Sequence, residues 1–165
     1  MEKLYIVRHG IAVEHGTPGY ADDQRPLTAK GKRRAREIGE GLARFGVEVD
    51  RIATSPLPRA RRTAEILAEE LGMEDRLENA QVLAAGSSAR AIGNWLAERP
   101  EASLMIVGHN PVLDELLSLL LLDDEEALPF SFKKGGVALL NRQTIHTDRF
   151  ELAWAATPRL LRGLA

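Results

Sequence analysis

The residues best suited to chemistry in this sequence are two histidines that each follow a short apolar run. His9 comes after Leu4–Val7 in the triplet Arg-His-Gly, and His109 comes after Leu104–Val107 in the string Gly-His-Asn-Pro. The chain has 4 histidines, so half of them occupy equivalent places. Neutral imidazole is a nucleophile near neutral pH, because its ordinary pKa is about 6.5. The two positions therefore indicate a site that uses imidazole chemistry.

Two arginines accompany these histidines. Arg8 precedes His9, and Arg59 stands shortly after a third apolar run, Ile52–Thr54, which ends at Ser55. Arginine keeps its charge and can bind phosphoryl oxygens through two parallel hydrogen bonds. Two arginines beside two histidines predict a cationic site for an anionic phosphoryl group, with imidazole as the nucleophile. Taken singly, each motif is also compatible with a structural histidine, a helix cap or a turn.

Short strands and amphipathic helices must position these residues. Apolar runs predict strands at Leu4–Val7, Ile52–Thr54, Leu104–Val107, Val137–Leu140 and Phe150–Trp154. Apolar residues at helical spacing predict helices between Thr28 and Gly46, from Ala60 to Gly72, from Ala89 to Leu96, and after Asn110. We expect Asn110 to be the N-cap of the last of these helices, with Pro111 at its first position.

This order of elements predicts an α/β fold, a three-layer sandwich. A mostly parallel central sheet would carry helices on both faces and an antiparallel hairpin at one edge. The carboxyl ends of parallel strands meet at one edge of a sheet, where such folds bind their ligands. The clusters after the three buried strands should therefore converge there.

Length and composition exclude several other classes of protein. The chain has 165 residues, no cysteine and a net charge of −2. The length predicts one domain, and the lack of cysteine excludes disulfide scaffolds, thiol catalysis and cysteine-based zinc sites. The charge balance argues against nucleic-acid binding. No apolar run is long enough for a secretory signal or a membrane span, so we expect a cytoplasmic protein without membrane partners.

In their order along the chain, the motifs resemble the histidine phosphatase superfamily, whose fold is phosphoglycerate-mutase-like, and within it the SixA-type phosphohistidine phosphatases. The segments that carry the resemblance are Leu4–Ala12, Arg25–Thr28, Ser55–Ala60 with Thr63, and Val107–Pro111. Ala12 and the pair Asn110-Pro111 favour the SixA type over mutases. The resemblance implies a single histidine-phosphatase domain over residues 1–165, without large cap insertions.

The resemblance also implies roles for individual residues. His9 would be the nucleophile and form a phosphohistidine intermediate, which water hydrolyses. Arg8, Arg59 and His109 would hold the phosphoryl oxygens. Further substrate contacts are expected from Arg25, Gly10, Ser55 and Asn110. We expect a backbone carbonyl to accept a hydrogen bond from the His9 ring, because no acid stands in its motif. The scheme needs neither metal nor cofactor.

The source of a proton for the leaving group is open. Many members of the superfamily use a carboxylate after the middle strands, but Gln81–Ala84 contains none. Glu78, Asp22 and Asp23 are the candidate general acids. Imidazole, with a pKa of about 6.5, needs a proton less than an alkoxide does when it leaves. A weak or missing acid therefore favours a phosphohistidine substrate.

Three functions remain open. The first is a phosphatase for histidine-phosphorylated proteins, the second a small-molecule phosphomonoester phosphatase, and the third a non-catalytic phosphate- or phosphoprotein-binding module. A basic stretch is either a solvated face or a rim that guides an acidic phosphoprotein; it consists of Lys30, Lys32, Arg33 and Arg34. His15 is expected in a loop and His146 in the turn of the hairpin.

Overall fold

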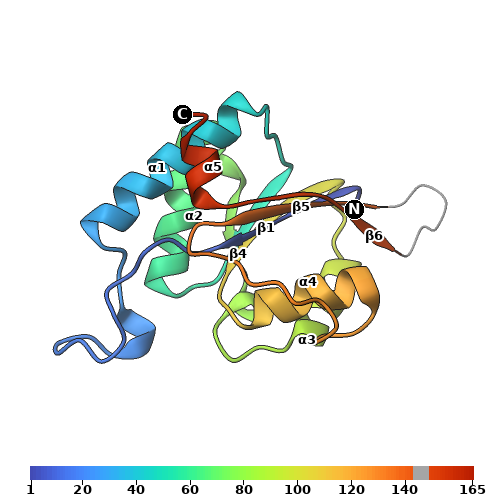
Figure 1. Cartoon of the computed structure of the whole chain (residues 1–165), viewed down its shortest axis with the longest axis horizontal. Coiled ribbons are helices and arrows are strands. Elements are labelled where there is room, and N and C mark those ends of the chain that lie inside the picture. Colours follow the sequence, from blue (N-terminus) through green and yellow to red (C-terminus); the bar gives the residue numbers. More distant parts are fainter. Residues whose placement is uncertain (143–148) are drawn as a thin grey trace.

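A six-stranded sheet forms the centre of the computed structural model, which describes residues 1–142 and 149–165 (Figure 1). Its strands are β1 (Lys3–Arg8), β2 (Arg51–Thr54), β3 (Leu77–Asn79), β4 (Ser103–Gly108), β5 (Val137–Arg142) and β6 (Phe150–Ala156). They lie in the order β3-β2-β4-β1-β5-β6. The first four are parallel, and β5 and β6 are antiparallel to their neighbours. The mostly parallel sheet with an antiparallel edge hairpin is confirmed.

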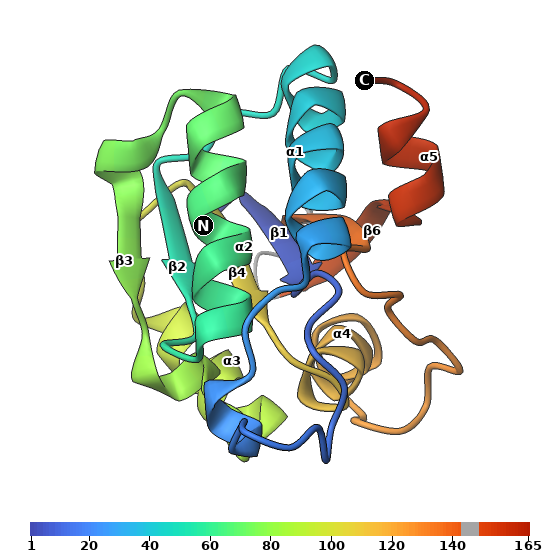
Figure 2. The same ribbon diagram turned by 90° about the vertical axis from the view of Figure 1, so that its left-hand side faces the viewer.

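Helices cover both faces of the sheet (Figure 2). One face carries α1 (Ala29–Arg44), α2 (Pro58–Leu71) and α5 (Pro158–Arg162), and the other carries α3 (Ala89–Ala97) and α4 (Val112–Leu122). Short 3₁₀ helices lie at Asp22–Gln24, Glu74–Arg76 and Gln81–Leu83. The strands and helices expected from the sequence are present. β3 and α5 were not expected, because three and five residues are too few to show a periodicity.

The central strand β1 shows why its sequence is apolar without alternation. Leu4 and Ile6 pack into the layer of α3 and α4, whereas Tyr5 and Val7 pack into the layer of α1, α2 and α5. All four side chains are buried. Both faces of the strand thus lie in a hydrophobic core, as is typical of parallel sheets between helical layers.

The ends of the helices follow local rules, with one exception. Thr28 Oγ1 accepts a hydrogen bond from the Gly31 amide at 2.9 Å, and Gly46 and Gly72 end α1 and α2 with positive φ angles of 71° and 67°. The prediction that Asn110 caps α4 is wrong. Pro111 is the residue that precedes the helix, and no side chain caps it. The Asn110 side-chain amide is directed instead to an acidic residue of α4, described below.

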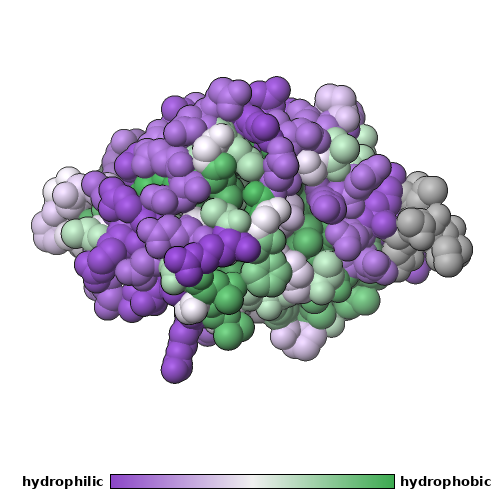
Figure 3. Space-filling model, turned by 90° about the horizontal axis from the view of Figure 1, so that it is seen from above, coloured by the Kyte–Doolittle hydropathy of each residue, from purple (hydrophilic) through white to green (hydrophobic). Residues whose placement is uncertain are grey.

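The surface above α1 and α5 is mixed in character. Hydrophilic residues surround smaller hydrophobic areas on this side of the molecule (Figure 3). Apolar side chains line a hollow of about 250 Å³; they are Phe45, Trp154, Ala156, Leu160, Leu161 and Leu164. None of the predicted site residues lies in this hollow. No described helix has both the length and the apolar character needed to cross a membrane.

Candidate active site

The two histidines meet at the carboxyl edge of the sheet. His9 follows β1 directly, His109 follows β4 directly, and these two strands are hydrogen-bonded neighbours. The centroids of the two imidazole rings are 5.1 Å apart. Arg59 joins them from the first turn of α2, and its charge acts on both histidines. The expected convergence of the motifs is therefore present.

His9 is a neutral imidazole ring, and one of its two nitrogens makes a hydrogen bond to the backbone. Its Nδ1 lies 2.7 Å from the Gly10 carbonyl oxygen. A carbonyl can only accept, so Nδ1 carries the proton and Nε2 keeps its lone pair. Burial lowers the pKa of His9 to about 3, and the neighbouring positive charges of Arg59 and Arg8 act in the same direction. The expected backbone carbonyl acceptor is thus present, and the ring is neutral at pH 7.

Gly10 positions His9. Its carbonyl accepts from the His9 ring, and its amide donates to Thr63 Oγ1 at 3.0 Å. The Thr63 hydroxyl in turn donates to the Arg59 carbonyl, one helical turn earlier, at 2.7 Å. The backbone amide and carbonyl of Gly10 are therefore both hydrogen-bonded to other residues of the chain. This argues against the prediction that Gly10 contacts the substrate. Thr63 was named with Ser55–Ala60 for its resemblance to the superfamily, but its position in the sequence did not reveal the contact with Gly10.

The loop after His9 also depends on a close approach by α1. A Cβ atom on Gly31 would lie 2.0 Å from the Ile11 carbonyl oxygen, which is far inside van der Waals contact. Thr28 Oγ1 donates to the same carbonyl at 3.2 Å. The first turn of α1 thus packs directly against the backbone that follows His9, and glycine is needed at position 31.

Backbone carbonyls orient the two arginines of the site. Arg8 Nη1 donates to the Phe132 carbonyl at 2.5 Å, and Arg59 Nη1 donates to the Asp22 carbonyl at 2.9 Å. Burial lowers the pKa of both side chains, but guanidinium remains charged at neutral pH. The Nε atoms of both arginines are buried without a hydrogen-bond partner in the described residues. These two donors can serve an anion.

His109 supplies a third donor of this kind. Its Nε2 lies 2.8 Å from Ser55 Oγ, and its Nδ1 is buried without a partner in the described part of the chain. Ser55 Oγ accepts from the Leu57 amide at 3.3 Å, so its own hydrogen can be donated to Nε2. Nδ1 then carries the ring's proton. Burial, followed by the charge of Arg59, lowers the pKa of His109 to about 4. Ser55 thus orients His109.

We call Arg8 Nε, Arg59 Nε and His109 Nδ1 the donor cluster. Buried donors without acceptors are rare in folded proteins, because each loses its bonds to water. The charges of Arg8 and Arg59, and that of His109 when it is protonated, act on the neighbouring His9 ring. The arrangement can hold the oxygens of a phosphoryl group while the free Nε2 of His9 attacks its phosphorus.

The loop before α1 contributes Arg25 and Asp22 to the rim of the site. Arg25 Nε donates to Asp22 Oδ1 at 2.8 Å, and the charge of Arg25 acts on Arg59 and His109. His15 Nδ1 lies 2.7 Å from the same Asp22 oxygen. These hydrogen bonds, first from His15 and then from Arg25, lower the pKa of Asp22. An ionised Asp22 is a poor proton donor at pH 7.

The other two candidate acids differ in their placement. The charge of Asp23 acts on Arg59, so Asp23 also lies near the site. Glu78 does not. Its carboxylate lies 2.8 Å from Arg99 Nη2 and 3.9 Å from Arg51 Nε, and Arg51 opens β2 at the amino edge of the sheet. The prediction of Glu78 as a general acid is wrong, because its side chain is directed toward the opposite edge.

Asn110 connects the site to residues that the sequence did not reveal. Its Nδ2 donates to Asp114 Oδ2 at 2.8 Å, and its Oδ1 is buried without a partner among the described residues. Asp114 Oδ1 accepts from the Phe132 amide at 2.9 Å. The four-residue spacing of Asn110 and Asp114, about one helical turn, was the only signal in the sequence, although Asn110 itself precedes α4. Nothing in the sequence placed Phe132 beside Arg8.

The remaining predicted residues lie as follows. His15 is exposed in the loop before α1, as expected, and His146 lies outside the described residues. Lys30, Lys32 and Arg33 are exposed on the first turns of α1. Two further exposed lysines, Lys133 and Lys134, precede Gly135, whose amide donates to the carbonyls of Arg8 and His9.

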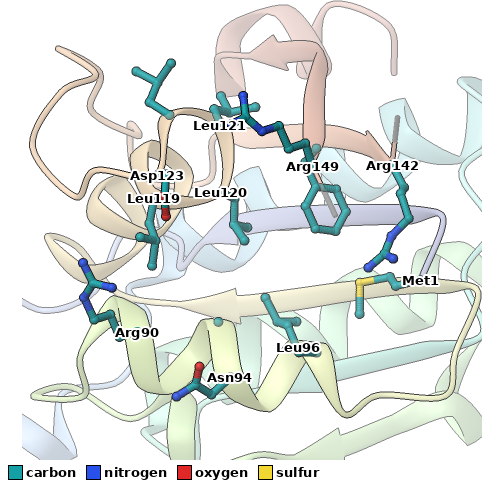
Figure 4. A pocket seen from close by; sticks show the side chains of 14 residues that line it. Met1, Arg90, Asn94, Leu96, Leu119, Leu120, Leu121, Asp123, Arg142 and Arg149 are labelled. Atoms are coloured by element: carbon teal, nitrogen blue, oxygen red, sulfur yellow. The ribbon is translucent and has the colours of Figure 1, made fainter. Parts of the chain in front are cut away.

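A larger groove of about 630 Å³ lies elsewhere, between α3, α4 and the β5–β6 hairpin (Figure 4). Leucines and Phe150 form its apolar lining, and Arg90, Arg142 and Arg149 contribute charge. Met1, which precedes β1, also lines it. The groove therefore opens near the amino end of β1, and it contains none of the site residues.

Comparison with known proteins agrees with this fold. The model of the histidine phosphatase superfamily (branch 1) matches residues 4–81. An uncharacterised protein of Picosynechococcus sp. is 38% identical over 96% of this chain and 98% of its own length. The structure of the protein histidine phosphatase SixA complexed with tungstate superposes with a TM-score of 0.83 at 23% identity, over 96% of this chain and 99% of that one.

A second solved structure, of SixA from Agrobacterium tumefaciens, has a TM-score of 0.79 at 26% identity over 95% of this chain and 98% of that one. The phosphoglycerate-mutase-like fold expected from the motifs is thus confirmed. By its family match, its fold and the order of its motifs, the chain belongs to branch 1 of the histidine phosphatase superfamily.

Proposed function

We propose that this protein is a phosphohistidine phosphatase that hydrolyses N-phosphohistidine on a protein, through a phosphohistidine intermediate at His9. The observation that carries the proposal is the state of His9. Its Nδ1 donates to the Gly10 carbonyl, its Nε2 has no hydrogen-bond partner among the described residues, and the residues of the donor cluster act electrostatically on the ring.

In the first step, His9 Nε2 attacks the phosphorus atom. A new P–N bond forms at His9, and the P–N bond to the substrate imidazole breaks, with its electron pair returning to the leaving nitrogen. The other ring nitrogen of the substrate carries a proton, so the group leaves as neutral imidazole. Arg8, Arg59 and His109 bind the phosphoryl oxygens as charge moves. Binding of a phosphoryl dianion raises the pKa of His109, so this residue takes up a proton and becomes a charged donor.

In the second step, water attacks the phosphorus atom of phospho-His9. The P–N bond breaks, inorganic phosphate leaves, and His9 returns to its neutral form. Positioning and charge neutralisation by the donor cluster supply the catalysis, so the proposal includes no metal and no cofactor. It also includes a single domain without helical cap insertions over the site, which leaves room for a protein substrate.

The substrate class follows from the leaving group. Asp22 is held ionised by His15 and Arg25, and Glu78 lies at the other edge of the sheet. When its other ring nitrogen is protonated, the substrate ring leaves as neutral imidazole, whose conjugate acid has a pKa of about 6.5, so it tolerates the lack of a strong acid. The likeness to SixA structures supports the same class. Lys133 and Lys134 beside the His9 backbone would favour an acidic protein partner.

One observation favours a second candidate, a small-molecule phosphomonoester phosphatase. Asp22 and Asp23 lie close enough for their charges to act on Arg59. If substrate binding moved one of these carboxylates and protonated it, it could supply the proton that an alkoxide needs. This candidate uses the same donor cluster and the same nucleophile.

The test compares turnover of a phosphohistidine-bearing protein with turnover of a panel of phosphomonoesters, with chelator present. We expect preference for the phosphohistidine substrate, and we expect His9→Ala to abolish turnover while affinity for inorganic phosphate is retained. Preference for a phosphomonoester would establish the second candidate. Turnover that survives His9→Ala would overturn both, and phosphate binding without any turnover would leave a binding module.

A further inference from the structure

Asp114 makes two hydrogen bonds that are unusual for an acid in the first turn of a helix. Its Oδ1 accepts from the Phe132 amide at 2.9 Å, and its Oδ2 accepts from Asn110 Nδ2 at 2.8 Å. Such an acid commonly interacts with its own helix N-terminus. Asp114 instead joins α4 to the chain segment that leads into β5, 18 residues later.

The same segment holds Arg8. The Phe132 carbonyl accepts from Arg8 Nη1 at 2.5 Å, and Asn110 Nδ2 lies 3.4 Å from this carbonyl oxygen. The Phe132 ring is 2% exposed and packs edge to face on Phe130, with ring centroids 4.9 Å apart. Phe132 thus links Asp114 to Arg8, because its side chain is well packed and its backbone amide and carbonyl are both hydrogen-bonded.

This link orients the guanidinium of Arg8. Nη1 donates to the Phe132 carbonyl, and with the group held in this way Nε is buried and without a partner among the described residues. Asp114 also supplies negative charge near Arg8, which counteracts the cost of burying the guanidinium. Its carboxylate does this without occupying a hydrogen-bond donor of Arg8.

We propose that Asp114 is a positioning residue for phosphoryl binding, which holds Phe132 so that Arg8 presents its Nε to the phosphoryl group. The role of Asp114 in catalysis rests on the proposed function, whereas its effect on the binding of an anion does not. Asp114 acts through Arg8 and touches no reacting atom.

A double-mutant cycle with inorganic phosphate tests the link. The variants are Arg8→Ala, Asp114→Asn and the double variant, and affinity is measured by calorimetry or by the shift in melting temperature with phosphate concentration. We expect Asp114→Asn alone to weaken binding about tenfold, as loss of a hydrogen bond to a charged group does. In the Arg8→Ala background the same substitution should have no further effect.

Glu115→Gln is the matched control, because Glu115 is the neighbouring acid in the first turn of α4. It should leave phosphate affinity unchanged. Equal losses from Asp114→Asn with and without Arg8, or an equal loss from Glu115→Gln, would overturn the proposal. If Asp114→Asn does not fold, Asp114→Glu replaces it, with a smaller loss and the same dependence on Arg8 expected. Phosphate binding that follows the cycle in a protein without turnover would reject the proposed function alone.

Discussion

Arginines at the two edges of the sheet have different hydrogen-bond partners and therefore different roles. At the amino edge, Arg99 makes bonds of 2.9 and 2.6 Å to Glu101 and of 2.8 Å to Glu78. At the carboxyl edge, Arg8 and Arg59 are bound by the backbone carbonyls of Phe132 and Asp22. A carboxylate orients an arginine and neutralises it, whereas a carbonyl orients it and leaves its charge in place. Only the second arrangement leaves positive charge and free donors for a ligand.

Removing one arginine from each edge should separate the two arrangements. We expect Arg59→Met to lower kcat/KM by about 10²–10³ with little loss of stability, since it removes a buried donor to the phosphoryl group. Arg99→Met should leave kcat/KM within about twofold and cost about 2 kcal/mol of unfolding free energy, because Glu78 and Glu101 lose their short ion pairs and keep only contacts of 3.9 Å with Arg51. Kinetics and chemical denaturation of both variants measure this. Similar effects of the two substitutions on catalysis would contradict the comparison.

The carboxyl edge should also make stability depend on pH. His9 and His109 have pKa values lowered to about 3 and about 4, against an ordinary value of 6.5. Below pH 6.5 the unfolded chain binds protons that the folded protein does not, so stability is full above pH 6.5 and declines as pH falls toward 4. At pH 5 the loss is about 2 kcal/mol for each histidine.

Urea denaturation at pH 7 and pH 5 checks this dependence. His109→Gln should reduce the difference in unfolding free energy between the two pH values by about 2 kcal/mol. Saturating phosphate should also reduce it, because the bound dianion favours protonated His109. A difference that is the same in the variant and in the unchanged protein would show that His109 is not the source.

Ser55 orients the His109 ring but carries no charge, so we expect its removal to lower kcat/KM less than removal of Arg59 does. Ser55→Ala removes the hydroxyl 2.8 Å from His109 Nε2, so the ring loses the contact that directs its Nδ1 proton. We expect kcat/KM to fall about tenfold, the size of one hydrogen bond to a group that becomes charged. Ser55→Thr, which retains the hydroxyl, should recover most of the activity. Failure of threonine together with full activity of alanine would exclude the positioning role.

The smallest effect is expected at Asp22. Asp22→Asn should change turnover of the phosphohistidine substrate less than threefold, because this leaving group needs no strong acid. Its backbone carbonyl, which holds Arg59, is retained. The same kinetics with a phosphomonoester provide the contrast. A loss of about 100-fold on the phosphohistidine substrate would identify Asp22 as an acid and remove the argument from the leaving group.

The sequence by itself determined the strands other than β3, the long helices and the convergence of His9, His109, Arg8 and Arg59. Buried parallel strands have uninterrupted apolar runs, and residues that follow such strands meet at one edge. Thr28, Gly46 and Gly72 marked helix ends because caps act within a few residues. These features depend on local spacing, so they can be predicted from one chain.

Only the tertiary structure decided which contacts orient the side chains of the site. The Arg8–Phe132 and His109–Ser55 bonds join residues 124 and 54 positions apart, and no periodicity encodes them. Glu78 was misplaced because the short strand β3 left its direction open. Asn110 was misassigned because its side-chain amide donates to Asp114, its oxygen has no partner among the described residues, and the helix begins after Pro111. Whether a charged side chain meets a carboxylate or a carbonyl depends on which distant segment packs against it, and packing is a property of the whole fold.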